Sequence, residues 1–525
     1  MNPHLALLVC ASSCAIATVA AQAQMSNTGP PGPGSGGPGG GGLAGFGGGR
    51  RGAPPPAWIE PGYDDHSNMM YQLGIKTLRP GKSGSNQTGP GFDEATANEW
   101  MGTMPDVLKM KDGTKVTTAA QWPKRRAEIL EDFEREVYGR IPANAPKVTW
   151  EITSTNETEV SGVPVITKVL VGHVDNSLFT NITVNIRASF TIPANTPGPV
   201  PVLISFGGVG GGFGGFGGRG AARGGGTNVS TNGIASPARG GRGAFGAAGG
   251  GISGQALAKG WGYGSLDPAS IQADAGGNAL RQGIIGLVNK GQPRKPDDWG
   301  ALRAWGWGFS RLIDYFEANL DSKVNAKFVG VEGVSRYGKA AIVTEAFDER
   351  VGPALVASSG EGGAKLHRHD FGEAVENLTG GEYYWMAGNF IKYGASDING
   401  KSMNASDLPV DSHELIALCA PRPCFISVGV ESAGDPKWID AAGLYRAGLL
   451  ASPVYALLGG KGYGEEIQDW VRAPLPPVGT LVGHDLVFRQ HEGGHTSGPN
   501  IPIYFDWVGS FIKSPALPPS APPKP

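Results

Sequence analysis

The chain has 525 residues, of which 40% are hydrophobic and 17% charged, so it is long enough to bury a large core. Its formal net charge of -2, without a dense basic stripe, gives no reason to expect a nucleic-acid partner. No segment after the first 23 residues has the length and apolar character of a membrane span.

The first 23 residues are predicted to be a secretory signal peptide. Leu5 to Ala20 are apolar or small, and Ala21-Gln22-Ala23 is typical of a cleavage site. A lipoprotein cleaved before Cys10 or Cys14 is an alternative, although neither cysteine has a good sequence context for it. The sequence therefore predicts export, either to the periplasm or out of the cell.

Tracts rich in glycine or proline divide the rest of the chain. We expect a disordered linker over residues 24–60 and a single folded domain over 61–513. A second glycine-rich tract, residues 207–251, follows an apolar strand and is predicted to be a mobile insertion at the surface of that domain. The proline-rich residues 514–525 form a tail.

The pattern within the domain predicts an α/β fold. Trp122 to Tyr138 has the spacing of an amphipathic helix, and the β-branched stretch from Val148 to Pro193 indicates antiparallel strands. Short apolar strands then alternate with helical stretches, which is typical of a doubly wound sheet. The strands and helices expected after residue 199 are Val202–Phe206, Trp299–Asn319, Phe328–Val331, Arg336–Phe347, Ala354–Ala357 and Cys424–Val430.

The segment from Lys327 to Ala341 predicts a nucleophile elbow. An apolar strand leads into Ser335, and a helix of small residues follows it. Gly333 and Gly338 flank the serine, which allows strand and helix to approach closely on a sharp turn. Ser335 is thus the candidate nucleophile.

A serine nucleophile needs a histidine base, and the histidine needs an acid to orient it. In an α/β-hydrolase arrangement the acid follows a late strand and the histidine lies near the end of the chain. We prefer His495 over His491, because two glycines let its loop fold over the elbow, and we expect His491 to be structural. For the acid we prefer Asp435, with Glu431 second.

Two basic residues, Arg336 and Lys339, follow the candidate nucleophile. The backbone N–H of Arg336 is expected to help bind the oxyanion, and Lys339 lies one helical turn after the nucleophile. Two cations at this place indicate an acidic substrate.

Cys419 and Cys424 are interpreted as small buried hydrophobic residues. A disulfide between them is permitted, whereas two cysteines without histidines do not make a metal site.

These motifs together resemble the glucuronoyl esterases of carbohydrate esterase family 15, in particular its bacterial members. Gly333 to Lys339 resembles the G-x-S-R-x-G-K signature of that family. The other similar segments occur in the family's order: Met104–Leu108, Arg125–Pro142, Asp297–Gly300, Trp305–Trp307, Ser359–Leu366, Asn377–Thr379, His413–Pro423 and Gly493–His495. The resemblance implies an α/β-hydrolase fold, a three-layer sandwich with a mostly parallel central sheet, and it implies neither metal nor cofactor.

The resemblance also implies roles for individual residues. Ser335 is the nucleophile, His495 the base and Arg336 the oxyanion stabiliser. The substrate-binding candidates are Lys339, Trp438 and Trp385. Many members place the triad glutamate where this chain has Ser358, and others place an acid after the later strand, which agrees with Asp435 or Glu431; Glu361, near the vacant position, is a third possibility.

The expected activity is cleavage of esters between lignin alcohols and the glucuronic or 4-O-methyl-glucuronic acid side groups of glucuronoxylan, through an acyl-enzyme. The alternative within enzymes is an acetyl xylan esterase or general carboxylesterase, because the fold alone does not fix the substrate. The alternative from another class is a non-catalytic polysaccharide-binding protein of the cell surface. We expect a monomer.

Overall fold

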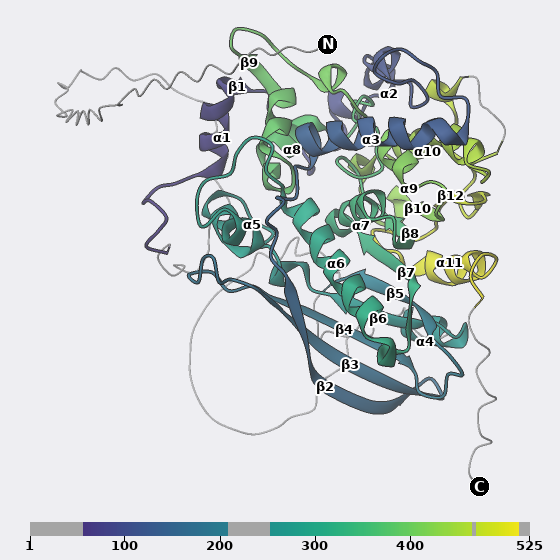
Figure 1. The fold of residues 1–525 in the computed structure, drawn as a ribbon. Helices are drawn as coiled ribbons and strands as arrows, with labels where there is room; N and C mark the ends of the chain where they lie inside the picture. The colour runs from purple at the N-terminus through teal and green to yellow at the C-terminus, as the bar shows by residue number, and fades with distance from the viewer. Residues whose placement is uncertain (1–55, 208–251, 465–468, 514–525) are drawn as a thin grey trace, which may run out of the picture. The chain divides into compact units, whose positions relative to one another are not determined.

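A computed structural model describes residues 56–207, 252–464 and 469–513 (Figure 1). The predicted leader, most of the predicted linker, residues 208–251 of the glycine-rich insertion and the proline-rich tail lie outside these residues. The last linker positions are folded: Ile59 is buried, and Glu60 forms an ion pair with Arg281. The folded domain therefore starts a few residues before residue 61.

The described residues form a ten-stranded sheet with the strand order β11-β12-β10-β8-β7-β5-β6-β4-β3-β2. The six strands from β12 to β6 run parallel, whereas β4, β3 and β2 at one edge and β11 at the other are antiparallel (Figure 1). A separate pair joins β1 and β9. The strands are β1 Ile75–Leu78, β2 Val148–Val160, β3 Val163–Val174, β4 Asn185–Pro193, β5 Val200–Phe206, β6 Gly262–Leu266, β7 Val324–Val334, β8 Val351–Ala357, β9 Ala395–Ile398, β10 Cys424–Val428, β11 Val482–Gly483 and β12 Leu486–Gln490.

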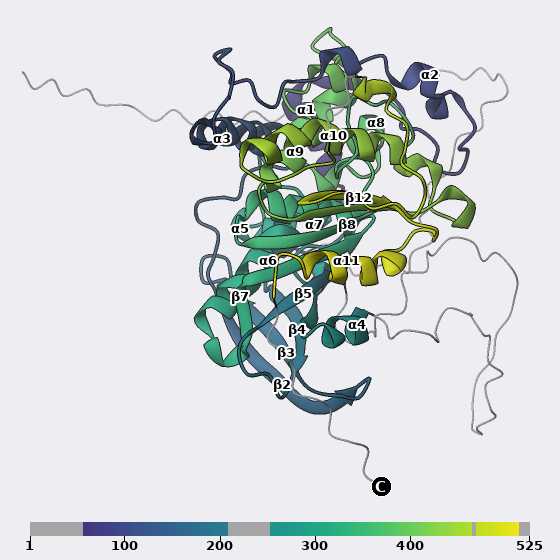
Figure 2. The same cartoon turned by 90° about the vertical axis from the view of Figure 1, so that its right-hand side faces the viewer.

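Helices cover both faces of the parallel part. Figure 2 shows α9 and α10 on one side of β8 and β12, and α4 and α11 on the other. The helices are α1 Asp65–Leu73, α2 Glu94–Ala97, α3 Trp122–Asp132, α4 Ile252–Ala258, α5 Gly283–Val288, α6 Ala301–Ala318, α7 Arg336–Phe347, α8 Val375–Gly380, α9 Ser412–Cys419, α10 Ala441–Leu457 and α11 Ile501–Val508. The predicted three-layer α/β-hydrolase sandwich is confirmed.

The central strands are largely apolar because both of their faces are covered. In β5, Val202 and Ile204 belong to the large core beneath α6 and α7, whereas Leu203 points into the smaller core beneath α4 and α11. In β8, Leu355 likewise faces the smaller core. Parallel strands buried on two faces require such continuous hydrophobic runs, which is why the sequence marks them clearly.

The predicted elements match closely, with local differences at the end of one helix and the start of one strand. The predicted antiparallel region is confirmed as β2, β3 and β4, and α7 has the predicted bounds. The helix predicted from Trp122 to Tyr138 is α-helical only to Asp132. Phe133–Val137 forms one turn of π-helix that buries Phe133 and Val137. In the described parts of the chain, no helix combines the length and apolar character that a bilayer span needs.

The topology brings the candidate residues to one edge of the sheet. Ser335 follows β7, Ser358 follows β8, Asp435 comes after β10, and His495 comes after β12. These four strands are parallel neighbours, so the segments that leave their carboxyl ends meet at the same edge.

Candidate active site

The nucleophile elbow has the strained geometry that the motif predicts. Ser335 has φ 62° and ψ −130°, a backbone conformation that residues other than glycine rarely adopt. A Cβ on Gly333 would lie 2.2 Å from the carbonyl oxygen of Tyr337, and one on Gly338 would lie 2.5 Å from the carbonyl oxygen of Ala357. Both glycines are therefore required by the close passage of β7, β8 and α7.

This geometry predicts the sign of a stability change. Alanine normally stabilises a helical position relative to glycine, but Gly338→Ala is expected to lower the free energy of unfolding by about 1–3 kcal/mol, because backbone atoms cannot move aside. Gly380→Ala, at the end of α8, is the matched control, since a Cβ there would meet nothing within 4 Å. Thermal unfolding of both variants checks this. A Gly338→Ala protein as stable as the control would contradict the geometry.

His495 and Asp435 are hydrogen bonded to each other. Nδ1 of His495 lies 2.8 Å from Oδ1 of Asp435, which is 2% exposed. The other carboxylate oxygen, Oδ2, accepts hydrogen bonds of 2.6 Å from the hydroxyl of Ser358 and from the backbone N–H of Gly429. The carboxylate is thus held by three partners, and Nε2 of His495 is left as the nitrogen that can take a proton.

The other acids considered from the sequence have different surroundings. Glu431 is exposed, and among the described residues its side chain forms no hydrogen bond. Glu361 is buried and pairs with Lys365 at 2.9 Å and with Nδ1 of His367. Burial raises the pKa of Glu361, but Lys365 and His367 outweigh it and lower the pKa to about 2. His495 therefore has Asp435 as its acid partner.

His491 has the structural surroundings that the sequence predicts. Its ring is buried, and Nδ1 accepts a hydrogen bond of 3.0 Å from the N–H of Gly493. Burial lowers the pKa of this histidine, so the ring is neutral at ordinary pH. A neutral acceptor at this point shapes the turn that carries His495.

Arg336 and Trp385 meet at an aspartate that the sequence did not single out. Nη1 of Arg336 donates to Oδ2 of Asp274 at 2.5 Å, and the indole N–H of Trp385 donates to Oδ1 at 2.8 Å. The guanidinium of Arg336 is half exposed and lies 5.7 Å from the ring centre of Trp385. Asp274 therefore fixes both an exposed cation and an aromatic wall beside the nucleophile.

Lys339 is buried rather than exposed. Its ammonium donates to the carbonyl oxygen of Ser359 at 2.7 Å and to Glu373 at 2.8 Å, and it lies 5.5 Å from the ring centre of Trp385. Trp438 is half-buried, and its carbonyl oxygen accepts from the N–H of Glu373 at 2.8 Å. Lys339 and Trp385 therefore form one cluster with the elbow helix. Trp438 joins it through its backbone contact to Glu373, while its ring packs beside Phe92, Ala97 and Phe371.

A second carboxyl group, Glu382, belongs to this cluster. Burial raises its pKa to about 7, with a further contribution from the negative charge of Glu373, while Lys339 and Arg336 oppose the shift. Asp274, Glu373 and Glu382 were all missed from the sequence, because they come from segments far from the elbow and carry no local motif. Glu382 stands next to the aromatic run that ends at Trp385, which is the one sequence signal that points to it.

Ser358 has a role that the sequence left open. The family resemblance gives this position to a triad glutamate, and here the serine hydroxyl donates to Asp435 at 2.6 Å. Ser358 is fully buried and has φ 43°, another strained position. The hydroxyl thus supports an acid that arrives from the neighbouring strand.

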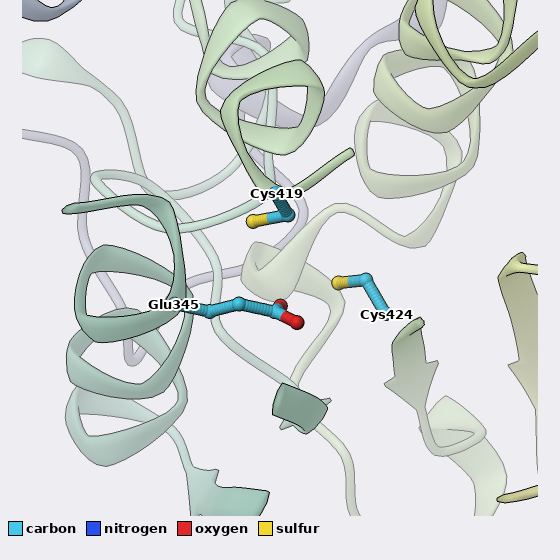
Figure 3. A group of neighbouring side chains, drawn as sticks. All are labelled: Glu345, Cys419 and Cys424. Carbon is cyan, nitrogen blue, oxygen red and sulfur yellow. The ribbon is translucent and has the colours of Figure 1, made fainter. Parts of the chain in front are cut away.

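The two cysteines lie elsewhere in the core, beside Glu345 of α7 (Figure 3). Both thiols are free and buried, which confirms their interpretation as small buried residues and not as a disulfide. Burial raises the pKa of Glu345 to about 7, and burial also raises the pKa of Cys419. The three ligand atoms lie within 4.8 Å of one another, yet no fourth His, Cys, Asp or Glu of the described chain joins them, whereas a structural zinc site has four protein ligands.

The parallel sheet with its helices on both faces, and the strained serine between β7 and α7, define the protein as an α/β-hydrolase. A family model described as "Glucuronyl esterase, fungi" matches residues 294–459. A carbohydrate esterase from an unknown prokaryotic organism, MZ0003, is 30% identical over 415 residues, which are 76% of this chain and 88% of that protein. The chain belongs to the glucuronoyl esterases of carbohydrate esterase family 15, a family of carboxylic ester hydrolases.

Solved structures agree with this assignment. A family 15 glucuronoyl esterase from Teredinibacter turnerae is 36% identical, with a TM-score of 0.71, and the match covers 85% of this chain and 99% of that one. A glucuronoyl esterase from Solibacter usitatus is 30% identical with a TM-score of 0.62 over 80% of this chain and 99% of that one. The 4-O-methyl-glucuronoyl methylesterase 1 of Wolfiporia cocos is 34% identical over 175 residues, 32% of this chain and 40% of its own length.

Proposed function

We propose that the protein hydrolyses esters of glucuronic acid or 4-O-methyl-glucuronic acid side groups of glucuronoxylan with lignin alcohols, through an acyl-enzyme on Ser335. The observation that carries this proposal is that cationic side chains, carboxyl groups and tryptophans contact one another in a cluster next to the nucleophile elbow. The relatives named as glucuronoyl esterases and methylesterases support the choice of ester.

The proposed reaction rests on the pairing of His495 with Asp435 and on the place of Ser335 at the same edge of the sheet. Oγ of Ser335 attacks the ester carbonyl while Nε2 of His495 takes its proton, and Asp435 stabilises the imidazolium that forms. The backbone N–H and the guanidinium of Arg336 stabilise the oxyanion. His495 then protonates the leaving alcohol, and a water molecule activated by the same nitrogen releases the uronic acid.

The proposed sugar site is the cluster around Lys339. An ammonium paired with Glu373, together with Glu382, offers a donor and acceptors for sugar hydroxyls. Trp385 and Trp438 offer apolar walls for the sugar ring. We assign these three residues, Lys339, Trp385 and Trp438, to substrate binding, with Ser335, His495, Asp435 and Arg336 in catalysis.

We further propose that the protein is exported and acts as a monomer on a polysaccharide substrate outside the cytoplasm. The apolar leader with its Ala-Gln-Ala site supports export. Lignin-carbohydrate esters are polymers that do not enter cells, which agrees with that location.

A panel of esters tests the proposed substrate. We expect faster release of acid from methyl or benzyl glucuronate than of acetate from acetylated xylan, because the cations at the elbow favour an acyl group that carries its own polar sugar ring. The measurement is kcat/KM for each ester with the full chain, with feruloyl esters as a further comparison. Faster deacetylation would replace the uronate assignment with that of an acetyl esterase.

A further inference from the structure

Glu332 is a buried carboxyl group in the same strand as the nucleophile. It lies three positions before Ser335 in β7 and is 3% exposed. No lysine, arginine or histidine of the described residues forms an ion pair with it. Burial raises its pKa, and the hydroxyls of Ser205 and Ser497 lower it. A carboxyl group without a counter-ion costs stability at such a position, beside Leu355 of the neighbouring strand β8.

The two oxygens of this carboxyl bind hydroxyls from two different directions. Oε2 accepts from the hydroxyl of Ser205, which lies opposite Glu332 in the parallel pairing of β5 and β7. Oε1 accepts from the hydroxyl of Ser497 at 2.7 Å. Ser497 is buried and follows His495 by two residues. Glu332 therefore joins the strand of the nucleophile to the loop of the base.

The rest of that loop is attached to a different strand. The carbonyl oxygen of Gly493 accepts from the N–H of Val430 at 2.8 Å, and the side-chain amide of Asn500 donates to the hydroxyl of Ser427 at 2.7 Å. Both contacts tie the loop to β10 or the residues just after it, two strands away from β7. Among the hydrogen bonds of the described residues, the contact between Ser497 and Glu332 is the one that joins residues 491–500 to β7.

We propose that Glu332 is a positioning residue, whose carboxylate holds Ser497 and thereby keeps His495 in register with Ser335. The inference rests on the proposed roles of Ser335 and His495. It explains why a costly carboxyl is kept inside an apolar strand: the geometry between base and nucleophile is set by two separate strands, and this contact couples them.

Three variants of the full chain test the proposal. Ser497→Ala removes the hydroxyl that links the loop to Glu332. Glu332→Gln is the conservative variant, because its amide can still pair with both hydroxyls. Ser412→Ala is the matched control, since it deletes a buried hydroxyl that has no partner in the described structure and lies outside the site.

The readouts are kcat and KM on methyl glucuronate, the rate of labelling by a fluorophosphonate, and the melting temperature. Ser497→Ala is expected to lower kcat and the labelling rate by about 10- to 100-fold at an unchanged KM, which is the cost of a misplaced catalytic group. Glu332→Gln should recover most of both rates, and Ser412→Ala should match the wild type.

A Ser497→Ala protein that keeps the wild-type kcat and labelling rate, or loses only melting temperature, would overturn the proposal. Labelling separates this outcome from a failure of the proposed substrate. If the wild type is labelled but does not hydrolyse the uronate ester, the substrate assignment fails and the labelling rates of the variants still decide the role of Glu332. If the wild type is not labelled, both proposals fall.

Discussion

Replacing Ser335 by alanine is expected to lower kcat on methyl glucuronate by about 10⁵- to 10⁶-fold, because it removes the atom that attacks the ester carbonyl. The change deletes one oxygen from a half-buried side chain. Alanine is not expected to relieve the strained backbone at this position, so the fold and the sugar cluster around Lys339 should remain. Substrate affinity should therefore survive the loss of turnover.

The measurement compares steady-state rates with binding of the free uronic acid to the inactive variant. Ser432→Ala is the matched control, since this serine is exposed on the loop that carries Asp435 and should leave turnover unchanged. A Ser335→Ala enzyme that retains most of its activity would remove Ser335 from the mechanism. Lost binding of the acid together with lost activity would indicate damage to the fold instead.

The fold could be predicted largely because its strands are buried on both faces. Runs such as Val200–Phe206 and Cys424–Val428 are apolar except for one serine each, and each is bounded by residues that end a strand. However, the spacing of hydrophobic residues cannot distinguish an α-helix from a single turn of π-helix. For this reason the predicted helix extends beyond Asp132, where the structure changes to a π-helix.

The alternation at Ile182 to Ile186 shows a second limit. The pattern predicts a strand, and these residues do alternate in burial, but β4 begins only at Asn185. The side chain of Asn176 donates to the carbonyl oxygen of Ile182 at 3.0 Å, so the start of the segment is held by a loop. Contact with β3 begins only at Val184, whose carbonyl oxygen accepts from the N–H of Val174 at 3.1 Å. Pairing partners far away in the sequence decide where a strand starts.

The candidate site could be predicted where its chemistry is local. The elbow around Ser335 and the glycines before His495 are visible within a few residues. The choice between Asp435 and Glu431 was not, because both lie on one short loop, and which carboxyl turns inward depends on Gly429 and on Ser358 from the adjacent strand. Asp274, Glu373 and Glu382 were invisible for the same reason, since only the folded sheet brings them to the elbow.

Asp435→Asn is the second change with a large expected effect, and the hydrogen bonds make its outcome specific. Ser358 and Gly429 both donate to Oδ2, so the amide oxygen of asparagine can take that position. Its NH₂ group must then face Nδ1 of His495, which can only accept from it. The imidazole is forced into the tautomer that carries its proton on Nε2, and this nitrogen can no longer accept the proton of Ser335.

We therefore expect Asp435→Asn to lower kcat by about 10⁴-fold with little change in KM or melting temperature. Glu431→Gln and Glu361→Gln are the comparison variants: the first alters an exposed side chain, and the second breaks a buried ion pair and should cost stability more than turnover. The kcat of each variant on methyl glucuronate decides between the three acids. A large loss in Glu431→Gln together with a small one in Asp435→Asn would move the orienting role to Glu431, and the three contacts around Asp435 would then serve only the fold of its loop.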